Sequence, residues 1–156
     1  MSVDGLRFTW RDQGTIGGVG IALTAGDPVP ALPLDLTTGL QVASVAASAT
    51  TTLWQATASP LTSFDFLYIM AGDYPTEDAL DTEDIPALVG QLELTCNDGA
   101  NERIWFEQMR SGFPYRRFSD VGVDGTSVAD VIDLIRFVNN TAAAVTVRFL
   151  LATVPA

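Results

Sequence analysis

The residues of this chain that could do chemistry are almost all carboxylates. The densest group lies within residues 73–84 and could chelate Ca²⁺, a hard cation that takes about six to eight oxygen ligands. It consists of Asp73, Glu77, Asp78, Asp81, Glu83 and Asp84. The glycine and the terminal glutamate of an EF-hand loop are missing, so a solvated acidic loop is the favoured interpretation. The segment SDVGVDG (119–125) poses the same choice more weakly.

A second group of acids lies on or near one predicted hairpin and could supply a glycosidase-like carboxylate pair. Its members are Glu93, Asp98, Glu102 and Glu107. Acids on exposed strand faces are usually only solvated, so a carboxylate-based hydrolase is kept as a minor alternative.

Other catalytic templates fail. The chain contains no His, and all eight of its basic residues are Arg, so a Ser–His–Asp triad and a P-loop lysine are both excluded. Cys96, the single cysteine, ends an apolar stretch and predicts a buried structural thiol. The glycines of GTIGGVG (14–20) lack the GxGxxG spacing and predict a structural strand. We therefore expect no enzyme, no cofactor and no catalytic residue.

Aromatic residues offer a different kind of site. Trp54, Trp105, Tyr68, Tyr74 and Tyr115 could form a sugar-binding platform, although scattered aromatics more often lie in a core or at a subunit seam. The segment FPYRRF (113–118) is the best exposed contact motif, because aromatics and Arg dominate interface hot spots. Its candidate interface residues are Phe113, Tyr115, Arg116, Arg117 and Phe118.

The charge balance limits the partners. Nineteen acids against eight basic residues give a net charge of −11, which disfavours nucleic acid and anionic membranes as partners. No apolar run reaches the roughly 18 residues that span a bilayer. The N-terminus shows no basic segment leading into an apolar one, so we expect no secretory signal and a chain that is made and used without export.

Short strands dominate the expected elements, because Thr, Val and aromatics are plentiful and Gly and Pro interrupt often. Expected strands are 6–12, 14–25, two within 39–59 with a turn near Ala47–Thr50, 63–73, and a hairpin over 91–109 that turns at Asn97–Gly99. The pattern of 128–138 fits a short helical turn followed by a strand from Ile132, with Asp133 breaking the alternation.

The last segment, FVNNTAAAVTVRFLLATV (137–154), predicts an antiparallel hairpin near the centre of a sheet. Asn139 and Asn140 tolerate the left-handed backbone conformation that tight turns require.

Three prolines make 26–36 an extended segment, since proline removes ladder donors. This segment is the best candidate for a linker or a wrapping arm, and its Pro28, Pro30 and Pro33 join the candidate interface. We expect two parts: residues 1–38, with strands and the Pro-rich arm, and residues 39–156. The predicted fold is all-β, an antiparallel β-sandwich of jelly-roll type with a Pro-rich N-terminal extension.

Three stretches between residues 50 and 154 resemble small structural proteins encoded among the head genes of tailed bacteriophages. Gln91–Thr95 is similar to a strand of that family, Ser111–Pro114 to its Gly-Pro loop, and Asp130–Asn139 to its closing strand. The acidic segment 74–88 departs from the pattern as an insertion, and the first 49 residues match nothing in it.

The resemblance implies a β-sandwich that is often trimeric and acts as a capsid decoration (cement) protein or head-fibre base. The resemblance implies a virion protein that is made in the host cytoplasm and lies on the capsid surface. Its expected partners are the major capsid protein and further copies of itself, with which it would form a homotrimer. A tail or fibre component and a carbohydrate-binding module that uses Trp54 or Trp105 are the alternatives.

Overall fold

The structure is a computed structural model that describes residues 5–6, 11–16, 19–24, 32–33, 37–73, 86–97, 102–121 and 131–153. The chain divides into two compact units. One comprises residues 1–35 with 154–156, and the other comprises residues 36–153.

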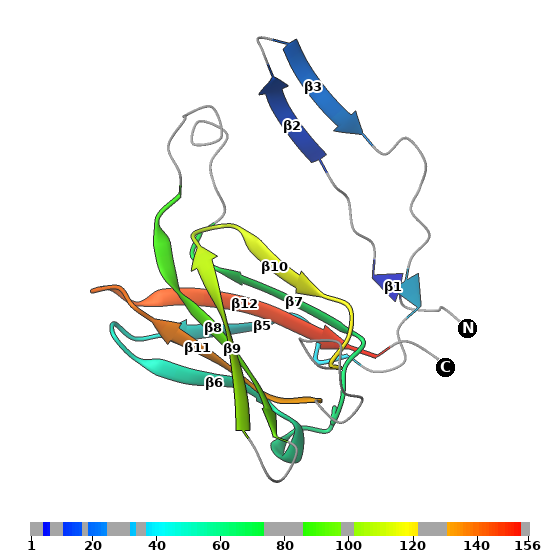
Figure 1. Cartoon of the computed structure of the whole chain (residues 1–156), viewed down its shortest axis with the longest axis vertical. Coiled ribbons are helices and arrows are strands. Elements are labelled where there is room, and N and C mark those ends of the chain that lie inside the picture. Colours follow the sequence, from blue (N-terminus) through cyan, green and yellow to red (C-terminus); the bar gives the residue numbers. More distant parts are fainter. Residues whose placement is uncertain are drawn as a thin grey trace. The chain divides into compact units, whose positions relative to one another are not determined.

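The N-terminal unit contains two short antiparallel pairs of strands (Figure 1). β1 (Gly5–Leu6) pairs with β4 (Leu32–Pro33), and β2 (Arg11–Ile16) pairs with β3 (Val19–Thr24). The prediction of a single strand over 14–25 is therefore wrong, because this Gly-rich segment is divided between the two strands β2 and β3. The strand expected over 6–12 falls largely on residues 7–10, which lie outside the described residues. The register pairs Ile16 with Val19, which leaves a Gly-Gly pair between the strands. Gly-Gly between two apolar runs is a sequence signal for a hairpin, which a single strand over this segment disregards.

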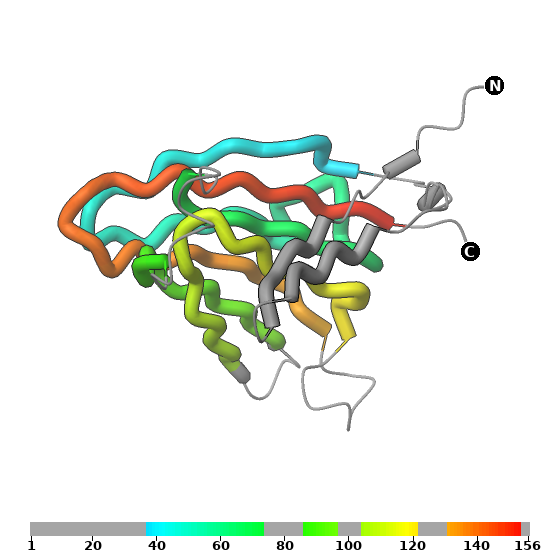
Figure 2. The backbone as a smooth tube through the Cα atoms, turned by 90° about the horizontal axis from the view of Figure 1, so that it is seen from above, coloured from blue at the N-terminus to red at the C-terminus, as the bar shows by residue number. Residues whose placement is uncertain are grey.

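The larger unit consists of two four-stranded antiparallel sheets, as the predicted all-β sandwich requires (Figures 1 and 2). The first sheet has the order β10-β7-β12-β5, and the second has the order β6-β11-β8-β9. The strands of the first sheet are β5 (Gln41–Val45), β7 (Phe66–Ala71), β10 (Pro114–Arg117) and β12 (Val145–Ala152). Those of the second are β6 (Thr50–Gln55), β8 (Leu88–Asn97), β9 (Glu102–Arg110) and β11 (Ile132–Asn139). A short 3₁₀ helix, η1 (Ala56–Ala58), follows β6.

The strand pairs of this unit are nested. β8 pairs with β9, β7 with β10, β6 with β11 and β5 with β12, so each successive pair encloses the one before it in the sequence. The chain thus behaves as one long antiparallel ribbon that is folded over into two layers. The predicted strands within 39–59 and the hairpin over 91–109 are confirmed as β5, β6 and the β8–β9 pair.

The prediction of a closing hairpin at 137–154 is wrong. β11 and β12 are both central strands, as expected, but they belong to different sheets and do not pair. The connection at residues 140–144 crosses from one layer to the other, and in Figure 2 it lies at one end of the sandwich (orange to red). Alternating burial could not distinguish the two arrangements, because a central strand of either sheet buries one face in the same core.

The role predicted for the asparagines is wrong as well. Among the described non-glycine residues only Ser48 has a positive φ, of 53°. Asn139 instead ends β11 and is 1% exposed. Its side-chain amide donates to the carbonyls of Val45 (3.0 Å), Ala46 (2.9 Å) and Ala143 (2.7 Å).

The Asn139 side-chain oxygen accepts bonds from the N–H and the hydroxyl of Thr141, both at 2.8 Å. The backbone adds two more contacts, from Asn139 N–H to the Ala49 carbonyl (2.9 Å) and from Ser48 N–H to the Thr141 carbonyl (3.1 Å). One buried side chain thus ties the β11–β12 connection to the β5–β6 connection. These bonds replace the ladder that a hairpin would have supplied.

The core fills the space between the sheets. Its buried side chains alternate along the strands, and β7 is buried on both faces, as its continuous apolar run predicts. Cys96 lies in this core, which confirms the expected buried thiol.

The predicted strand from Ile132 is also confirmed, and the register shifts between Ile132 and Leu134. This bulge accommodates Asp133, which interrupted the alternation. The helical turn expected at 128–131 lies outside the described residues, except for Val131, which bridges to Val121.

Candidate protein-interaction surface

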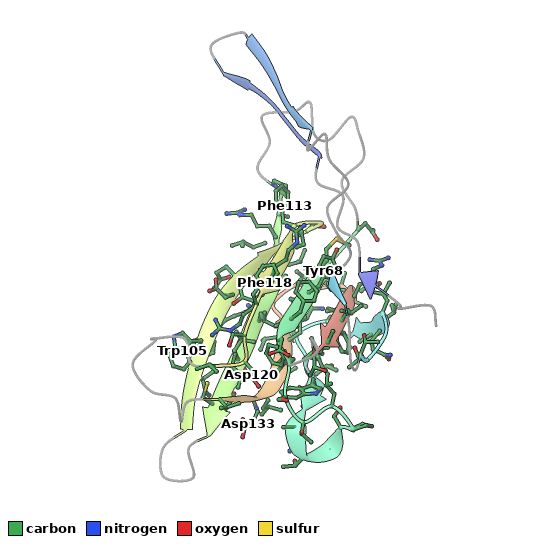
Figure 3. The ribbon with its side chains drawn as sticks, turned by 90° about the vertical axis from the view of Figure 1, so that its right-hand side faces the viewer. Tyr68, Trp105, Phe113, Phe118, Asp120 and Asp133 are labelled. Carbon is green, nitrogen blue, oxygen red and sulfur yellow. The ribbon has the colours of Figure 1, made fainter. Side chains whose placement is uncertain are left out.

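The FPYRRF motif forms an edge of the first sheet. β10 pairs only with β7 among the described strands, and Phe113 and Phe118 flank its two ends (Figure 3). Their side chains are 47% and 66% exposed, which is unusual for phenylalanine in a domain with a complete core. Two large apolar side chains are therefore presented at the two ends of one edge strand.

The other residues of the motif have mixed roles. Tyr115 packs against the core. Arg117 is used internally, because its guanidinium donates to the carbonyls of Ser119 (2.7 Å) and Val121 (2.6 Å) and so fixes the loop after β10. Arg116, opposite Tyr68 in the register, is half-buried. The five candidate residues of the FPYRRF motif thus lie on and beside one edge strand, with Phe113 and Phe118 as the exposed members, and their role in binding stays a prediction.

An apolar sheet face continues from Phe118. Residues of β7 alternate, so Leu67 and Ile69 point into the core while Phe66, Tyr68 and Met70 point to the opposite face. The rings of Phe66 and Phe118 lie 5.4 Å apart, tilted at 52°. Phe66 and Met70 are both 0% exposed, so Phe118 packs at the margin of a covered apolar face and is the exposed side chain of this group.

The prolines of the candidate interface give less information. Pro33 belongs to β4, opposite Gly5. Pro28 and Pro30 lie outside the described residues, so the proposed wrapping of the 26–36 segment stays a prediction.

Asp120 joins three segments beside this surface. Its carboxylate accepts a bond from Phe64 N–H (3.3 Å), its own N–H donates to the Phe64 carbonyl (3.1 Å), and its carbonyl accepts from Ile132 N–H (2.8 Å). Burial raises the pKa of Asp120 above its ordinary value, and the nearby Asp65 carboxylate raises it further. The backbone bonds and the charge of Arg117 oppose that rise without cancelling it. Asp120 therefore has a structural role, because its hydrogen bonds hold the loops at this end of the sandwich together.

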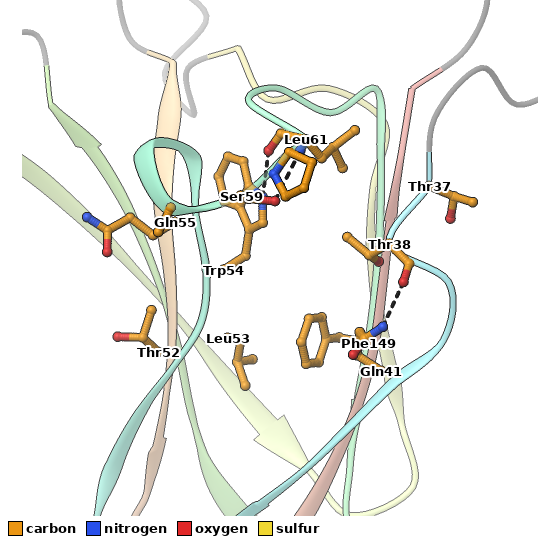
Figure 4. Close-up of a pocket in the computed structure, with 12 residues that line it drawn as sticks. Thr37, Thr38, Gln41, Thr52, Leu53, Trp54, Gln55, Ser59, Leu61 and Phe149 are labelled. Carbon is orange, nitrogen blue, oxygen red and sulfur yellow. Dashed lines mark hydrogen bonds between the residues drawn. The ribbon is translucent and has the colours of Figure 1, made fainter.

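A cavity of about 540 Å³ opens between the edge strands β5 and β6 (Figure 4). Its apolar lining comes from Leu53, Trp54, Leu61 and Phe149, and its polar lining from Thr and Gln side chains and Ser59. Sequence reasoning missed this cavity. All of its lining except Phe149 comes from residues 36–64, which contain no Asp, Glu, Lys or Arg although charged residues make up 17% of the chain. That absence of charge indicates no cavity until the topology of the strands is known.

Trp54 is held in the wall of this cavity as a core residue. It is 4% exposed, its indole N–H donates to the Leu61 carbonyl (3.0 Å), and its ring meets Phe64 edge to face at 5.5 Å. A sugar platform needs an open aromatic face, which Trp54 does not offer. Trp105, on β9, is half-buried (Figure 3).

The acidic candidates lie apart where they are described. Asp73 is exposed, and the remaining acids of the predicted Ca²⁺ loop lie outside the described residues. On the β8–β9 hairpin Glu93 forms an ion pair with Arg136 at 3.0 Å, across the β8–β11 register, while Glu107 is exposed on β9. Within the described ranges no three His, Cys, Asp or Glu side chains are grouped as metal ligands would be. The same part of the chain has no helix with the length and apolar character to cross a bilayer.

Comparisons with protein-family models, with curated proteins and with solved structures find no match to this chain.

Proposed function

We propose that this chain is a non-enzymatic structural protein of a tailed-phage virion that decorates the outer surface of the head shell. The observation that carries the proposal is the nested pairing of the eight sandwich strands, with β5 beside β12 and β6 beside β11. That order supports a jelly roll, an arrangement used by viral capsid and lectin domains. Fold alone does not fix function, so the sequence resemblance has to supply the virion context.

The positions of the resembling motifs support the same proposal. Gln91–Thr95 lies in β8 and Asp130–Asn139 ends in β11, and these two strands pair along most of their length. Gly112, in the Gly-Pro loop, has φ +76° and donates its N–H to the Ala71 carbonyl at 2.8 Å. The shared motifs thus serve the sandwich itself, as expected if what is shared is an architecture rather than a reaction.

Attachment would use the exposed aromatics Phe113 and Phe118, with the 26–36 segment adding contacts to a neighbouring capsomer. A homotrimer on a symmetry axis of the shell multiplies a weak contact, because the later contacts become intramolecular once the first has formed. The acidic surface stays soluble in a dense array and is not attracted to packaged DNA.

The test is co-sedimentation of the purified chain with head shells assembled from the major capsid protein of the same phage. We expect saturable binding and shells that resist heating better when the chain is bound. Phe118→Asp should abolish binding and leave the fold intact, since the side chain is 66% exposed, although the lost contact with the Phe66 ring should lower the melting temperature slightly. A matched control is Val121→Asp, which changes an exposed apolar residue (41%) outside the motif. A chain that stays in the supernatant, or shells equally heat-resistant without it, would contradict the proposal.

A tail or fibre position is the second candidate and uses the same chemistry. Antibody labelling of intact particles separates the two, since label on the head is expected and label on the tail alone would favour the alternative.

A further inference from the structure

The two open sides of the sandwich differ sharply in charge. One side is formed by edge strands β9 and β10, and it carries Glu107, Arg110, Arg116 and Arg117 together with Pro114. The other side is formed by edge strands β5 and β6, which belong to the uncharged run 36–64. Charges and prolines on an edge strand block pairing with other chains. The β9–β10 side has these safeguards and the β5–β6 side has none.

The unprotected side also exposes apolar side chains. Leu40, just before β5, is 60% exposed, and Val42, within β5, is 64% exposed. β5 pairs with β12 on one side only, and no other described strand pairs with its free edge. In an antiparallel sheet every second residue of such a strand directs its N–H and C=O outward. β5 therefore combines outward backbone groups with exposed apolar surface.

The net charge decides which partner fits this edge. Strands that pair lie about 4.8 Å apart, so their side chains are brought into contact. Two copies of a chain with net charge −11 repel each other over most of their surface. An edge without any charged residue lets one copy approach another without bringing carboxylates together.

We propose that the β5–β6 edge is the surface through which this chain binds a second copy of itself, with β5 adding its free edge to the neighbour's sheet. The inference deepens the self-association that is part of the proposed function and names the contact that carries it. It does not depend on the location in the virion or on the number of subunits.

The test is the solution mass of the full-length chain by light scattering and sedimentation velocity, over a range of concentrations. We expect an oligomer for the wild type. Val42→Asp and, separately, Ser44→Lys should each raise the dissociation constant of the oligomer by about tenfold or more. Val42→Asp adds a carboxylate to the contact between acidic copies, and Ser44→Lys adds a charged residue of the kind that blocks pairing at an edge strand. Both side chains are exposed, so circular dichroism and the monomer fold should be unchanged.

The matched control is Phe106→Asp, which adds the same charge at an exposed apolar residue (54%) on the opposite edge strand, β9. It should leave the mass unchanged. Higher salt should tighten the oligomer, since it screens the repulsion between acidic copies.

A wild type that stays monomeric at high concentration would overturn the inference. So would an oligomer that Phe106→Asp dissociates while Val42→Asp does not, or a Val42→Asp variant that keeps its mass and loses only shell binding. An oligomer that depends on Val42 but does not bind shells would retain this inference and remove the proposed virion role.

Discussion

Replacing Asn139 by alanine removes the side chain that ties the two connections at one end of the sandwich. The substitution deletes bonds to three carbonyls, of Val45, Ala46 and Ala143, and leaves the Thr141 N–H without its acceptor. A buried polar group left unsatisfied costs about 1–3 kcal/mol. Some of these groups reach water once the connection loosens, so we expect a net loss of about 2–4 kcal/mol.

That loss is a large fraction of the roughly 5–15 kcal/mol by which a domain of this size is stable. The assay is urea unfolding followed by circular dichroism, with the midpoint and slope compared between variants. Asn140→Ala is the matched control. Asn140 is the exposed neighbour of Asn139, so its replacement should change the free energy of unfolding by no more than about 0.5 kcal/mol. Asn139→Asp should be worse than alanine at neutral pH, since it turns a carboxylate toward three carbonyl oxygens. A loss below about 1 kcal/mol for Asn139→Ala, or equal losses at both asparagines, would refute the reasoning.

Gly90→Ala should destabilise the fold by about 2–4 kcal/mol in the same assay, because its Cβ would overlap the Phe137 ring, a nearest approach of 2.5 Å, and the β11 backbone; a neutral effect would mean that β8 and β11 are less closely packed. Asp120→Asn removes a titrating group whose folded pKa is raised, and such a group stabilises the fold when protonated. The wild type should therefore lose stability relative to Asp120→Asn as the pH rises through the folded pKa of Asp120, and denaturant melts between about pH 4 and pH 7 would show it. If the free energies of unfolding of the wild type and Asp120→Asn differ by the same amount at every pH in that range, the raised pKa of Asp120 would be contradicted. Trp54→Phe should lower the melting temperature without changing any sugar binding, and saturable binding lost in this variant would restore the carbohydrate-binding alternative.

Local patterns predicted the elements well where one residue type fixes one structure. The alternation in β11 and β12 and the continuous apolar run of β7 each translated directly into burial. Asp133 was recognised as an interruption, and the structure accommodates it with a bulge.

Pairing of strands could not be predicted in the same way. Phe137 and Val147 face the same core from opposite sheets, and period-two burial is identical whether the partner is adjacent in one sheet or opposite in the other. The information lay in Asn139, whose side chain has enough donors and acceptors to replace a turn. That role depends on the Val45 and Ala46 carbonyls, which are distant in sequence and could not be placed from local pattern.

The candidate surface was predicted in part. The FPYRRF motif was identified by composition, but only the strand geometry distinguishes the exposed Phe113 and Phe118 from the inward Tyr115. The β5–β6 edge was overlooked because an absence of charge over 36–64 signals nothing until the topology shows that this run forms both edges of one open side.

The proposal that the chain is a building block of a phage head is tested most directly by quantitative mass spectrometry of purified particles from a phage that carries its gene. We expect the chain in a fixed ratio to the major capsid protein, retained after the tails are removed. A chain that is absent from washed particles, or that is lost together with the tails, would contradict the account.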